Sequence, residues 1–451
     1  MKNTIDFNKN TVNKFVMSKS MVSKALEKAL DNEILTINGD KEVYAYEKGK
    51  WCVKPNRYLE NSIINILDNT EEKYFDDDIV YCALASINKV SKIKSFAERV
   101  YKNLAIDRSE LDNDVNLINF EDCTYDLNTL RYKEHNRDDY ITKSTNYEIS
   151  TTENSDVSLW ENCIKEWVCG DKELIHWLQK FCGYILTGDN REQRFYTLYG
   201  SGCNGKTVFQ KVLESVLGDY CETGKEDTLT DSYGDGNNKP RPDLLRFQGK
   251  RLITFSEFSA RSKLNESLMK RLTGNDSIVV RKLYGNDYIE FVNTAKILIA
   301  TNYLPEIKGQ DTGIWRRVCP IPFNAIITNK DDKLLDKLLA NKQAIFHWMI
   351  EGYEMYLREG LDDCKAITDL LNGYKEESDP ISDFMKEHVT IEKGEKLITI
   401  SQFYQSYLEY CEAVKEKPLI RKEFKQLIET NYGLINKHTN KERGYEIKLK
   451  K

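Results

Sequence analysis

Residues 200–207 read Gly200-Ser201-Gly202-Cys203-Asn204-Gly205-Lys206-Thr207, which fits the pattern Gly-x4-Gly-Lys-Ser/Thr without a gap. β-type residues precede this stretch at 195–199, and an amphipathic helical pattern follows it at 208–217. A strand, a glycine-rich loop and a helix in this order are the context in which the pattern binds phosphate. The alternation of apolar runs and helical stretches up to residue 323 favours an α/β core with a mainly parallel sheet. The opposing interpretation is a glycine-rich turn that happens to precede Lys206 and Thr207.

The residue types of this phosphate loop suit a bound nucleotide. Glycines allow successive backbone N–H groups to point inward and to bind an anion at a helix N-terminus. Lys206 is expected to reach the β- and γ-phosphates, and the Thr207 hydroxyl is expected to ligate Mg²⁺. All eight residues from 200 to 207 are therefore candidate nucleotide-binding residues, and ATP and Mg²⁺ are the expected cofactors.

The next β-type run, 251–255, leads to Ser256 and Glu257. A nucleoside triphosphatase needs a carboxylate near the metal and the attacking water, at the end of a buried strand. Glu257 is the candidate for both tasks, and the opposing interpretation is a surface glutamate that follows a strand. Many such sites carry two adjacent acids, whereas Ser256 precedes Glu257 here. Either one carboxylate serves both metal and water, or Ser256 helps to hold the metal's water shell.

Three further candidates follow along the chain. Asn302 ends the apolar run 295–301 and is placed to hydrogen-bond the γ-phosphate or the attacking water, unless it only starts a turn before Pro305. Arg316 and Arg317 precede the next β-type run. A guanidinium that reaches the γ-phosphate of a neighbouring subunit acts as an arginine finger. The alternative is a structural arginine pair on a solvated turn.

The order of these motifs is similar to that of superfamily 3 helicases. The phosphate loop, the strand before Glu257, the stretch 270–276, the strand before Asn302 and the arginine pair follow one another as in that family. Over about residues 110–325 the chain most resembles the helicase part of phage, plasmid and poxvirus primase–helicases. The resemblance implies an AAA+ ATPase that forms a homo-hexameric ring and pulls single-stranded DNA through its pore, usually 3′→5′.

In that family a β-hairpin between the second and third strands projects into the pore. Here two β-type runs between 277 and 291 flank a Tyr-Gly-Asn turn, which is typical of a hairpin. Arg281 and Lys282 offer charge for phosphates, and Tyr284 offers a ring on which a base can stack. The alternative is an ordinary hairpin with solvated charges.

The C-terminal region differs in charge from the rest of the chain. Residues 415–451 hold 11 Lys or Arg against 5 Asp or Glu, a local charge of +6 in a chain with a net charge of -6. Two helical patterns, 400–414 and 421–430, precede β-type runs at 434–435 and 445–447. This order is winged-helix-like, and Arg421, Lys422 and Lys425 are the candidate DNA contacts of its recognition helix. The alternatives are a solvated basic tail and a protein-docking domain.

The expected organisation is an AAA+ P-loop ATPase core between a mixed α/β N-terminal part and a winged-helix-like C-terminal domain. The predicted segments are an N-terminal module of unknown role at 1–75, an α-rich lead-in domain at 76–190, the core at 191–330, a helical segment at 331–377 and the winged-helix-like domain at 378–451.

Composition excludes several other classes of protein. No apolar run approaches the roughly 18 residues of a membrane helix, and the N-terminus has no signal-peptide pattern. The 11 cysteines are scattered without a Cys-x-x-Cys pair, which argues against a zinc site. A cytoplasmic protein without a membrane partner, in a bacterial host cell, is expected.

The leading hypothesis is an ATP-dependent hexameric DNA helicase for the replication of a phage, a plasmid or another mobile element. It would bind single- and double-stranded DNA and work with a separate primase or initiator protein. Fewer than 200 residues precede the phosphate loop, without an acidic cluster suited to nucleotidyl transfer, so primase activity is not expected. The alternative is an ATP-switched DNA-binding replication initiator or regulator without processive unwinding. An AAA+ protein remodeller has no support in the C-terminal pattern.

Overall fold

The computed structural model describes twelve stretches of the chain. They are residues 19–31, 33–55, 57–73, 90–149, 156–230, 241–256, 258–259, 262–281, 288–307, 312–391, 397–438 and 443–450. The chain divides into two compact units, residues 1–154 with 217–220 and residues 155–216 with 221–451. This division falls inside the segment 76–190, and the domain limits expected from sequence stay predictions.

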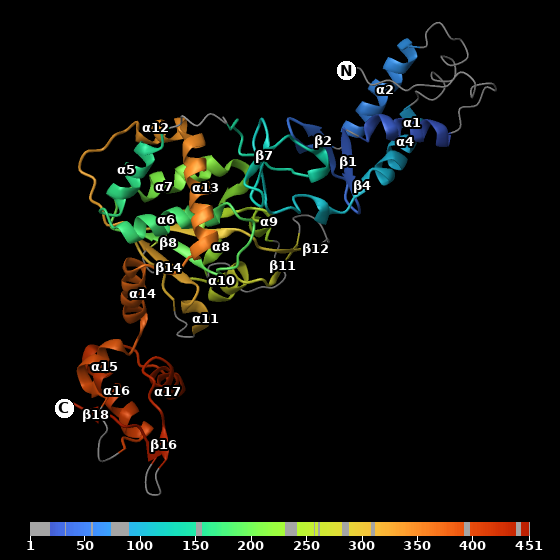
Figure 1. Cartoon of the computed structure of the whole chain (residues 1–451). Helices are drawn as coiled ribbons and strands as arrows, with labels where there is room; N and C mark the ends of the chain where they lie inside the picture. The colour runs from blue at the N-terminus through green and yellow to red at the C-terminus, as the bar shows by residue number, and fades with distance from the viewer. Residues whose placement is uncertain are drawn as a thin grey trace. The chain divides into compact units, whose positions relative to one another are not determined.

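The first unit contains a four-stranded sheet with helices packed on it (Figure 1). The sheet order is β3-β2-β1-β4, with β1 at Ile34–Ile37, β2 at Val43–Glu47, β3 at Lys50–Lys54 and β4 at Ala105–Ile106. The helices are α1 (Lys19–Leu30), α2 (Tyr58–Lys73) and α4 (Val90–Asn103). Apolar residues at helical spacing form their common core, in which Leu26, Ile63 and Phe96 are buried.

A second, antiparallel sheet of this unit comprises β5 (Leu117–Asn119), β6 (Thr124–Asp126) and β7 (Arg131–Lys133). The expected α-rich lead-in therefore contains strands as well as helices. A short helix, Gly218–Tyr220, packs here although it comes from much later in the sequence. Its Asp219 carboxylate accepts hydrogen bonds from Lys50 Nζ at 2.7 Å and from Asn146 Nδ2 at 2.8 Å.

The second unit is built on a five-stranded sheet of order β14-β8-β13-β10-β9. Every neighbouring pair in it is parallel, which confirms the expected α/β class with a parallel sheet. The strands are β8 (Phe195–Tyr199), β9 (Cys221–Thr223), β10 (Leu252–Ser256), β13 (Lys296–Thr301) and β14 (Val318–Pro322). The central strands β10 and β13 are buried along almost their whole length, because a parallel sheet is covered on both faces.

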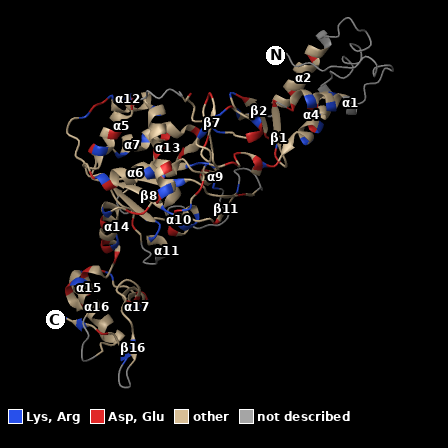
Figure 2. Cartoon of the chain, in the orientation of Figure 1, with Lys and Arg blue, Asp and Glu red and all other residues tan. Residues whose placement is uncertain are grey.

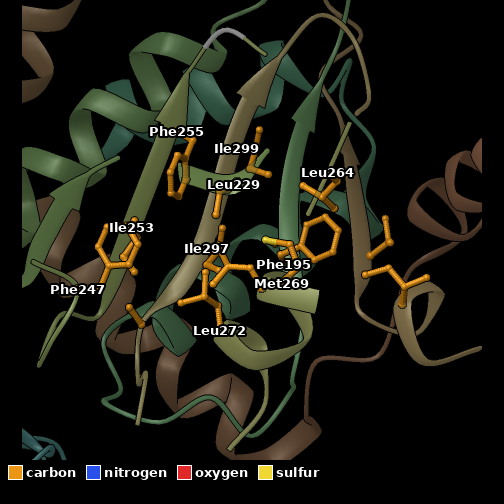
Figure 3. Packing of buried hydrophobic residues seen from close by; sticks show 14 of the residues in the cluster. Phe195, Leu229, Phe247, Ile253, Phe255, Leu264, Met269, Leu272, Ile297 and Ile299 are labelled. Atoms are coloured by element: carbon orange, nitrogen blue, oxygen red, sulfur yellow. The ribbon is translucent and has the colours of Figure 1, made fainter. Parts of the chain in front are cut away.

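Alternate residues of β10 face opposite sides of the sheet. Ile253 and Phe255 point into the large apolar cluster on one side, together with Ile297 and Ile299 of β13 (Figure 3). Thr254 and Ser256 face the other side, where they contact helix α7 (Lys206–Leu217). The apolar cluster also includes residues of α8 (Glu226–Leu229), α9 (Pro242–Leu245), α10 (Glu266–Thr273) and α11 (Thr312–Trp315).

Further helices complete the second unit. They are α5 (Ser158–Trp167), α6 (Lys172–Ile185), α12 (Leu334–Ala340), α13 (Lys342–Glu359), α14 (Lys365–Ser378), α15 (Ser382–His388), α16 (Ile400–Val414) and α17 (Arg421–Thr430). Helices α6 and α13 pack closely, since a Cβ added to Gly183 would lie 2.0 Å from the Tyr353 backbone nitrogen. None of the helices in the described stretches is long and apolar enough to cross a membrane.

The C-terminal region has its own apolar core, in which Phe384, Phe403 and Phe424 are buried. Helices α16 and α17 begin and end where the sequence predicts them. The predicted positions of the β-runs are wrong: the hairpin strands are β16 (Lys437–His438) and β17 (Arg443–Gly444), and β18 (Lys448–Leu449) pairs with β15 (Val389–Thr390). Leu434, Tyr445 and Ile447 pack into this core. Their side chains therefore mark core positions and not the paired residues of the hairpin.

Candidate functional site

The phosphate loop lies where the strand order of the sheet reverses. After β8 the chain passes to the far edge of the sheet at β9 and returns through β10 to β13, and it then places β14 on the other side of β8. In open α/β sheets, ligands bind at the carboxyl ends of the strands beside such a switch point. The loop of residues 200–205 occupies this place, and α7 begins directly after it at Lys206.

Two glycines of the loop are required by their surroundings. A Cβ on Gly200 would lie 2.1 Å from the Phe323 carbonyl oxygen, and one on Gly205 would lie 2.3 Å from Trp167 Nε1. Gly205 also has a φ of +86°, a region that side chains disfavour. Because both approaches are too close for any side chain, the glycines let the loop pack against Trp167 of α5 and the end of β14.

A strap formed by residues 323–327, directly after β14, holds the loop from outside. Asn204 Nδ2 donates to the Phe323 carbonyl at 2.8 Å, and the Ile327 N–H donates to the Cys203 carbonyl at 3.0 Å. These two bonds use a side-chain amide and a carbonyl of the loop and none of its backbone N–H groups. Sequence reasoning missed the strap, because no motif marks it.

Lys206 joins three of the residues that the sequence singled out. Its Nζ donates to the Gly200 carbonyl at 2.7 Å, to Asn204 Oδ1 at 2.9 Å and to Asn302 Oδ1 at 3.0 Å. All three acceptors are neutral, and within the described residues no carboxylate lies at ion-pair distance from this ammonium. Burial lowers the pKa of Lys206. A buried cation whose partners among the described residues are neutral oxygens is suited to an anionic ligand such as a phosphate.

The corner expected to hold the metal lies between α7 and the end of β10. The Thr207 side chain is exposed at the start of α7, and Ser256 is exposed at the end of β10. Glu257 lies outside the described residues. Hydroxyl and carboxylate oxygens are the donors that Mg²⁺ prefers, and at phosphate sites it takes one or two protein ligands and keeps water. The residue types at this corner therefore fit Mg²⁺.

No cage of three or more His, Cys, Asp or Glu side chains occurs among the residues that the structure describes.

Polar contacts between α7 and β10 lie directly behind the metal corner. Gln210 Nε2 donates to Ser256 Oγ at 3.1 Å, and Thr254 Oγ1 donates to Glu214 Oε1 at 2.5 Å. Sequence reasoning noted Ser256 and missed Gln210, although its position three residues after Thr207 was a usable signal.

The two arginines differ in their surroundings. The Arg317 side chain is 9% exposed, and it donates from Nε to Thr273 Oγ1 at 3.1 Å and from Nη1 to the Gly313 carbonyl. Arg316 is exposed and donates from Nη2 to Gln193 Oε1 at 3.3 Å. The structure thus gives Arg317 intramolecular partners within the core and leaves the Arg316 side chain at the surface.

Both arginines lie at the end of the sheet opposite to the phosphate loop. They precede β14, whose first residue, Val318, pairs with Phe195 at the start of β8. The phosphate loop follows the end of β8, so the five residues of this strand separate the two places, about 16 Å at the usual rise per residue. Neither arginine therefore joins the Lys206 site within one chain.

The hairpin expected between the second and third strand motifs is present as β11 (Ser277–Arg281) and β12 (Tyr288–Val292). Ile278, Val280 and Phe291 are buried on one face. The other face carries Arg281 directly opposite Tyr288, whose side chain is 63% exposed. Lys282 and Tyr284 lie outside the described residues. Tyr288 is an aromatic candidate that sequence reasoning missed, although the period-two alternation of 288–292 indicates its exposure.

On α17, Phe424, Leu427 and Ile428 are buried, which directs the basic residues outward. Arg421 and Lys422 are exposed, and Lys425 is half-buried. Arg421 Nη2 donates to Ser401 Oγ at 2.8 Å, and Lys425 Nζ lies 3.8 Å from Glu429 Oε1. Figure 2 shows Lys and Arg interspersed with Asp and Glu along the described elements. The excess of basic residues in 415–451 is therefore a local feature of a chain with mixed charge.

Two family models match the chain, one after the other. The model described as D5 N terminal like matches residues 22–182. A family of unknown function, DUF5906, matches residues 198–317, which include the phosphate loop and the arginine pair.

Relatives with provisional helicase and primase names come from viruses. The helicase L207/L206 of Acanthamoeba polyphaga mimivirus is 28% identical over 375 residues, which cover 76% of this chain and 38% of the viral protein. The primase C962R of African swine fever virus is 24% identical over 276 residues, or 56% of this chain and 29% of that protein. The chain therefore spans well under half the length of these relatives.

Among solved structures, the apo C-terminal region of NrS-1 is similar over 91% of this chain and 87% of that chain, with 12% identity and a TM-score of 0.49. The chain is thus similar to D5 N-terminal-like proteins over residues 22–182 and to viral proteins named as helicases and primases.

Proposed function

We propose that this chain is an ATP-dependent DNA helicase or translocase with a superfamily 3 AAA+ core. The observation that carries the proposal is the position of Lys206 Nζ, which links the phosphate loop to Asn302 at the switch point of a parallel sheet. This is the arrangement that an NTPase needs, with a cation for the β- and γ-phosphates beside a polar side chain for the reacting end.

Nucleotide binding would exchange the partners of Lys206. The ammonium would turn from the neutral oxygens of Gly200 and Asn302 to phosphate oxygens, which form stronger, charge-assisted hydrogen bonds. Asn302 would then be available to orient the γ-phosphate or the attacking water. Thr207 and Glu257 would hold Mg²⁺, which when bound neutralises charge on the β- and γ-oxygens. Glu257 would accept the proton of the attacking water.

The position of Arg316 supports assembly into a ring, for which we propose six chains. Its distance from the phosphate loop of its own chain excludes a role in cis, while its surface exposure allows it to reach the loop of a neighbouring subunit. An arginine supplied in this way stabilises the charge of the transition state and contributes about 10³–10⁵ in rate. Arg317, with partners in its own core, would hold the turn that presents Arg316.

DNA would contact two separate surfaces. The exposed face of β11 and β12, with Arg281 opposite Tyr288, combines a cation with an aromatic ring and suits single-stranded DNA. Lys282 and Tyr284 of the same hairpin are expected to add to it. Arg421, Lys422 and Lys425 of α17 suit the phosphates of duplex DNA.

The biological setting that we propose is replication of a virus, phage, plasmid or other mobile element, because the named relatives are viral helicases and primases. A 3′→5′ polarity and a separate primase or initiator partner complete the proposal. An ATP-switched initiator remains the second candidate, since the α16–α17 region with its hairpin suits duplex binding without translocation.

A strand-displacement assay tests the proposal. The chain is incubated with a forked duplex and ATP, and in parallel with a non-hydrolysable ATP analogue. A helicase displaces the strand with ATP alone, whereas an initiator binds the duplex with either nucleotide and displaces nothing. Absence of both nucleotide binding and displacement would overturn both functions.

A further inference from the structure

The face of β10 that contacts α7 carries hydroxyl side chains where a buried parallel strand usually carries apolar ones. Thr254 is fully buried, and Ser256 follows it on the same face. Buried polar groups require hydrogen-bond partners, and α7 supplies them one helical turn apart. Gln210 contacts Ser256, Glu214 contacts Thr254, and Gln210 Nε2 also donates to Glu214 Oε1 at 2.8 Å.

The two ends of this contact differ in exposure. Gln210 is 4% exposed, whereas Ser256 lies at the exposed end of its strand, next to Glu257. Gln210 is also three residues after Thr207, so their side chains lie on the same face of α7, about one turn apart. The Thr207 hydroxyl and the Ser256 hydroxyl therefore flank the same corner, with Gln210 behind it.

We propose that Gln210 is a positioning residue that fixes the Ser256 hydroxyl at the magnesium corner, where it hydrogen-bonds a water of the metal's shell. The inference rests on the proposed ATPase function and deepens it. The Gln210 amide donates to one lone pair of Ser256 Oγ at 3.1 Å. Ser256 Oγ also donates to Gln210 Oε1 at 3.4 Å, so both polar atoms of the amide contact this hydroxyl. The second lone pair of Oγ can accept a hydrogen bond from a water on the exposed side. Ser256 then takes the place that a second acid occupies in sites with two adjacent carboxylates.

A purely structural tie between α7 and β10 would make the same hydrogen bond. The two roles predict different effects of Mg²⁺ on the nucleotide affinity of a variant. A tie affects folding stability and nucleotide binding under all conditions, whereas an outer-shell role affects only the part of nucleotide binding that Mg²⁺ contributes. Partners of metal ligands typically change metal affinity by about 10–100-fold when they are removed.

The experiment measures the affinity of the full chain for a fluorescent ATP analogue, once with Mg²⁺ and once with EDTA. The variants are Gln210→Ala, Gln210→Met, Ser256→Ala and Gln210→Met/Ser256→Ala. Gln210→Met keeps the side-chain length and guards against a folding defect of the alanine variant. Thr254→Val is the matched control, since it removes the neighbouring hydroxyl contact between the same two elements and leaves Gln210 and Ser256 in place.

We expect Gln210→Met to weaken binding about tenfold with Mg²⁺ and to leave it unchanged in EDTA. The double variant should bind no more weakly than Ser256→Ala, because Gln210 acts through Ser256. Thr254→Val should lower the melting temperature without a magnesium-specific loss. Equal losses in both conditions, or additive losses in the double variant, would overturn the inference while the ATPase function stands. A wild-type chain that binds no nucleotide would instead overturn the proposed function itself.

Discussion

Lys206 and Asn302 are 96 positions apart in the sequence, and a hydrogen bond of 3.0 Å joins Nζ of the first to Oδ1 of the second. Lys206 starts α7, and Asn302 follows β13, which is the direct neighbour of β8 in the sheet. The bond therefore connects the residues that follow two neighbouring strands. It places Asn302 beside the phosphate loop, where the γ-phosphate is expected. We expect substitution of Lys206 to affect nucleotide binding and substitution of Asn302 to affect the rate of hydrolysis.

Lys206→Ala should abolish ATP binding and hydrolysis, because the buried charge for the β- and γ-phosphates is lost. Asn302→Ala should retain binding and lower the turnover rate, by about 10²-fold if it orients the water as a single polar donor does elsewhere. Steady-state ATPase rates, together with nucleotide affinity in the absence of turnover, separate the two effects. An Asn302→Ala chain with normal turnover would leave Asn302 as the start of the turn before Pro305.

Glu257→Gln should keep ATP binding and stop hydrolysis, since an amide cannot accept the proton of the attacking water. The affinity for ATP with Mg²⁺ and the rate of phosphate release are the two measurements. Glu226→Gln is a suitable control, because Glu226 is a carboxylate that accepts hydrogen bonds from Ser259 and should leave turnover intact. Near-normal hydrolysis by Glu257→Gln would show that another group activates the water.

Much of this site could be predicted from the sequence because its parts are local. A glycine pattern between a strand and a helix specifies the phosphate loop, and apolar runs that end in Ser256 and Asn302 specify strand ends. The parallel sheet follows from the same alternation. The boundaries of α16 and α17 were predictable because their buried faces repeat at helical spacing.

What the sequence could not supply depends on contacts between distant elements. Arg316 and Arg317 are adjacent and identical in type, and only the folded chain shows that one reaches Thr273 and the other the surface. The partnership of Gln210 with Ser256 spans 46 positions. The predicted position of the C-terminal hairpin was wrong because Tyr445 packs into the core of this region. Sequence periodicity does not distinguish such a core residue from a residue of a β-strand.

Arg316→Ala should abolish ATP hydrolysis in rings of identical chains and leave nucleotide binding intact. Mixing Arg316→Ala chains with Lys206→Ala chains should restore part of the ATPase rate, because a mixed ring contains interfaces at which an intact Lys206 faces an intact Arg316. The rate is measured across mixing ratios, with mixed hexamers verified by mass. No recovery in verified mixed rings would contradict a role in trans.

Arg317→Ala should act differently from Arg316→Ala. Its guanidinium donates to the buried Thr273 hydroxyl and to the Gly313 carbonyl, so its loss removes a hydrogen bond from each of these two acceptors. A destabilisation of about 1–3 kcal/mol is expected, measured by denaturant unfolding. If Arg317→Ala is as stable as wild type and shows the mixing behaviour predicted for Arg316, the finger assignment moves to Arg317.

Tyr288→Ala should weaken binding of single-stranded DNA by about 1–3 kcal/mol, the usual contribution of one stacked base. The double variant Arg281→Ala/Lys282→Ala should lose unwinding activity and retain duplex binding. Tyr288→Phe should restore affinity, because the ring stacks and the hydroxyl does not. Glu290→Gln, on the same exposed face, serves as the control and should bind equally or more tightly. An unchanged affinity in Tyr288→Ala would leave this face as an ordinary solvated hairpin.

The triple variant Arg421→Ala/Lys422→Ala/Lys425→Ala should weaken duplex binding and flatten its salt dependence. Each phosphate that a cation neutralises contributes about 0.9 to the slope of log affinity against log salt concentration, so three contacts predict a change of up to about 2.7. Duplex affinity is measured at several salt concentrations, with Lys448→Ala as an exposed basic control away from α17. An equal change per residue in the control would indicate a diffuse basic tail. An unchanged slope in the triple variant, with ATPase intact, would assign this region to protein docking and place duplex binding elsewhere in the chain.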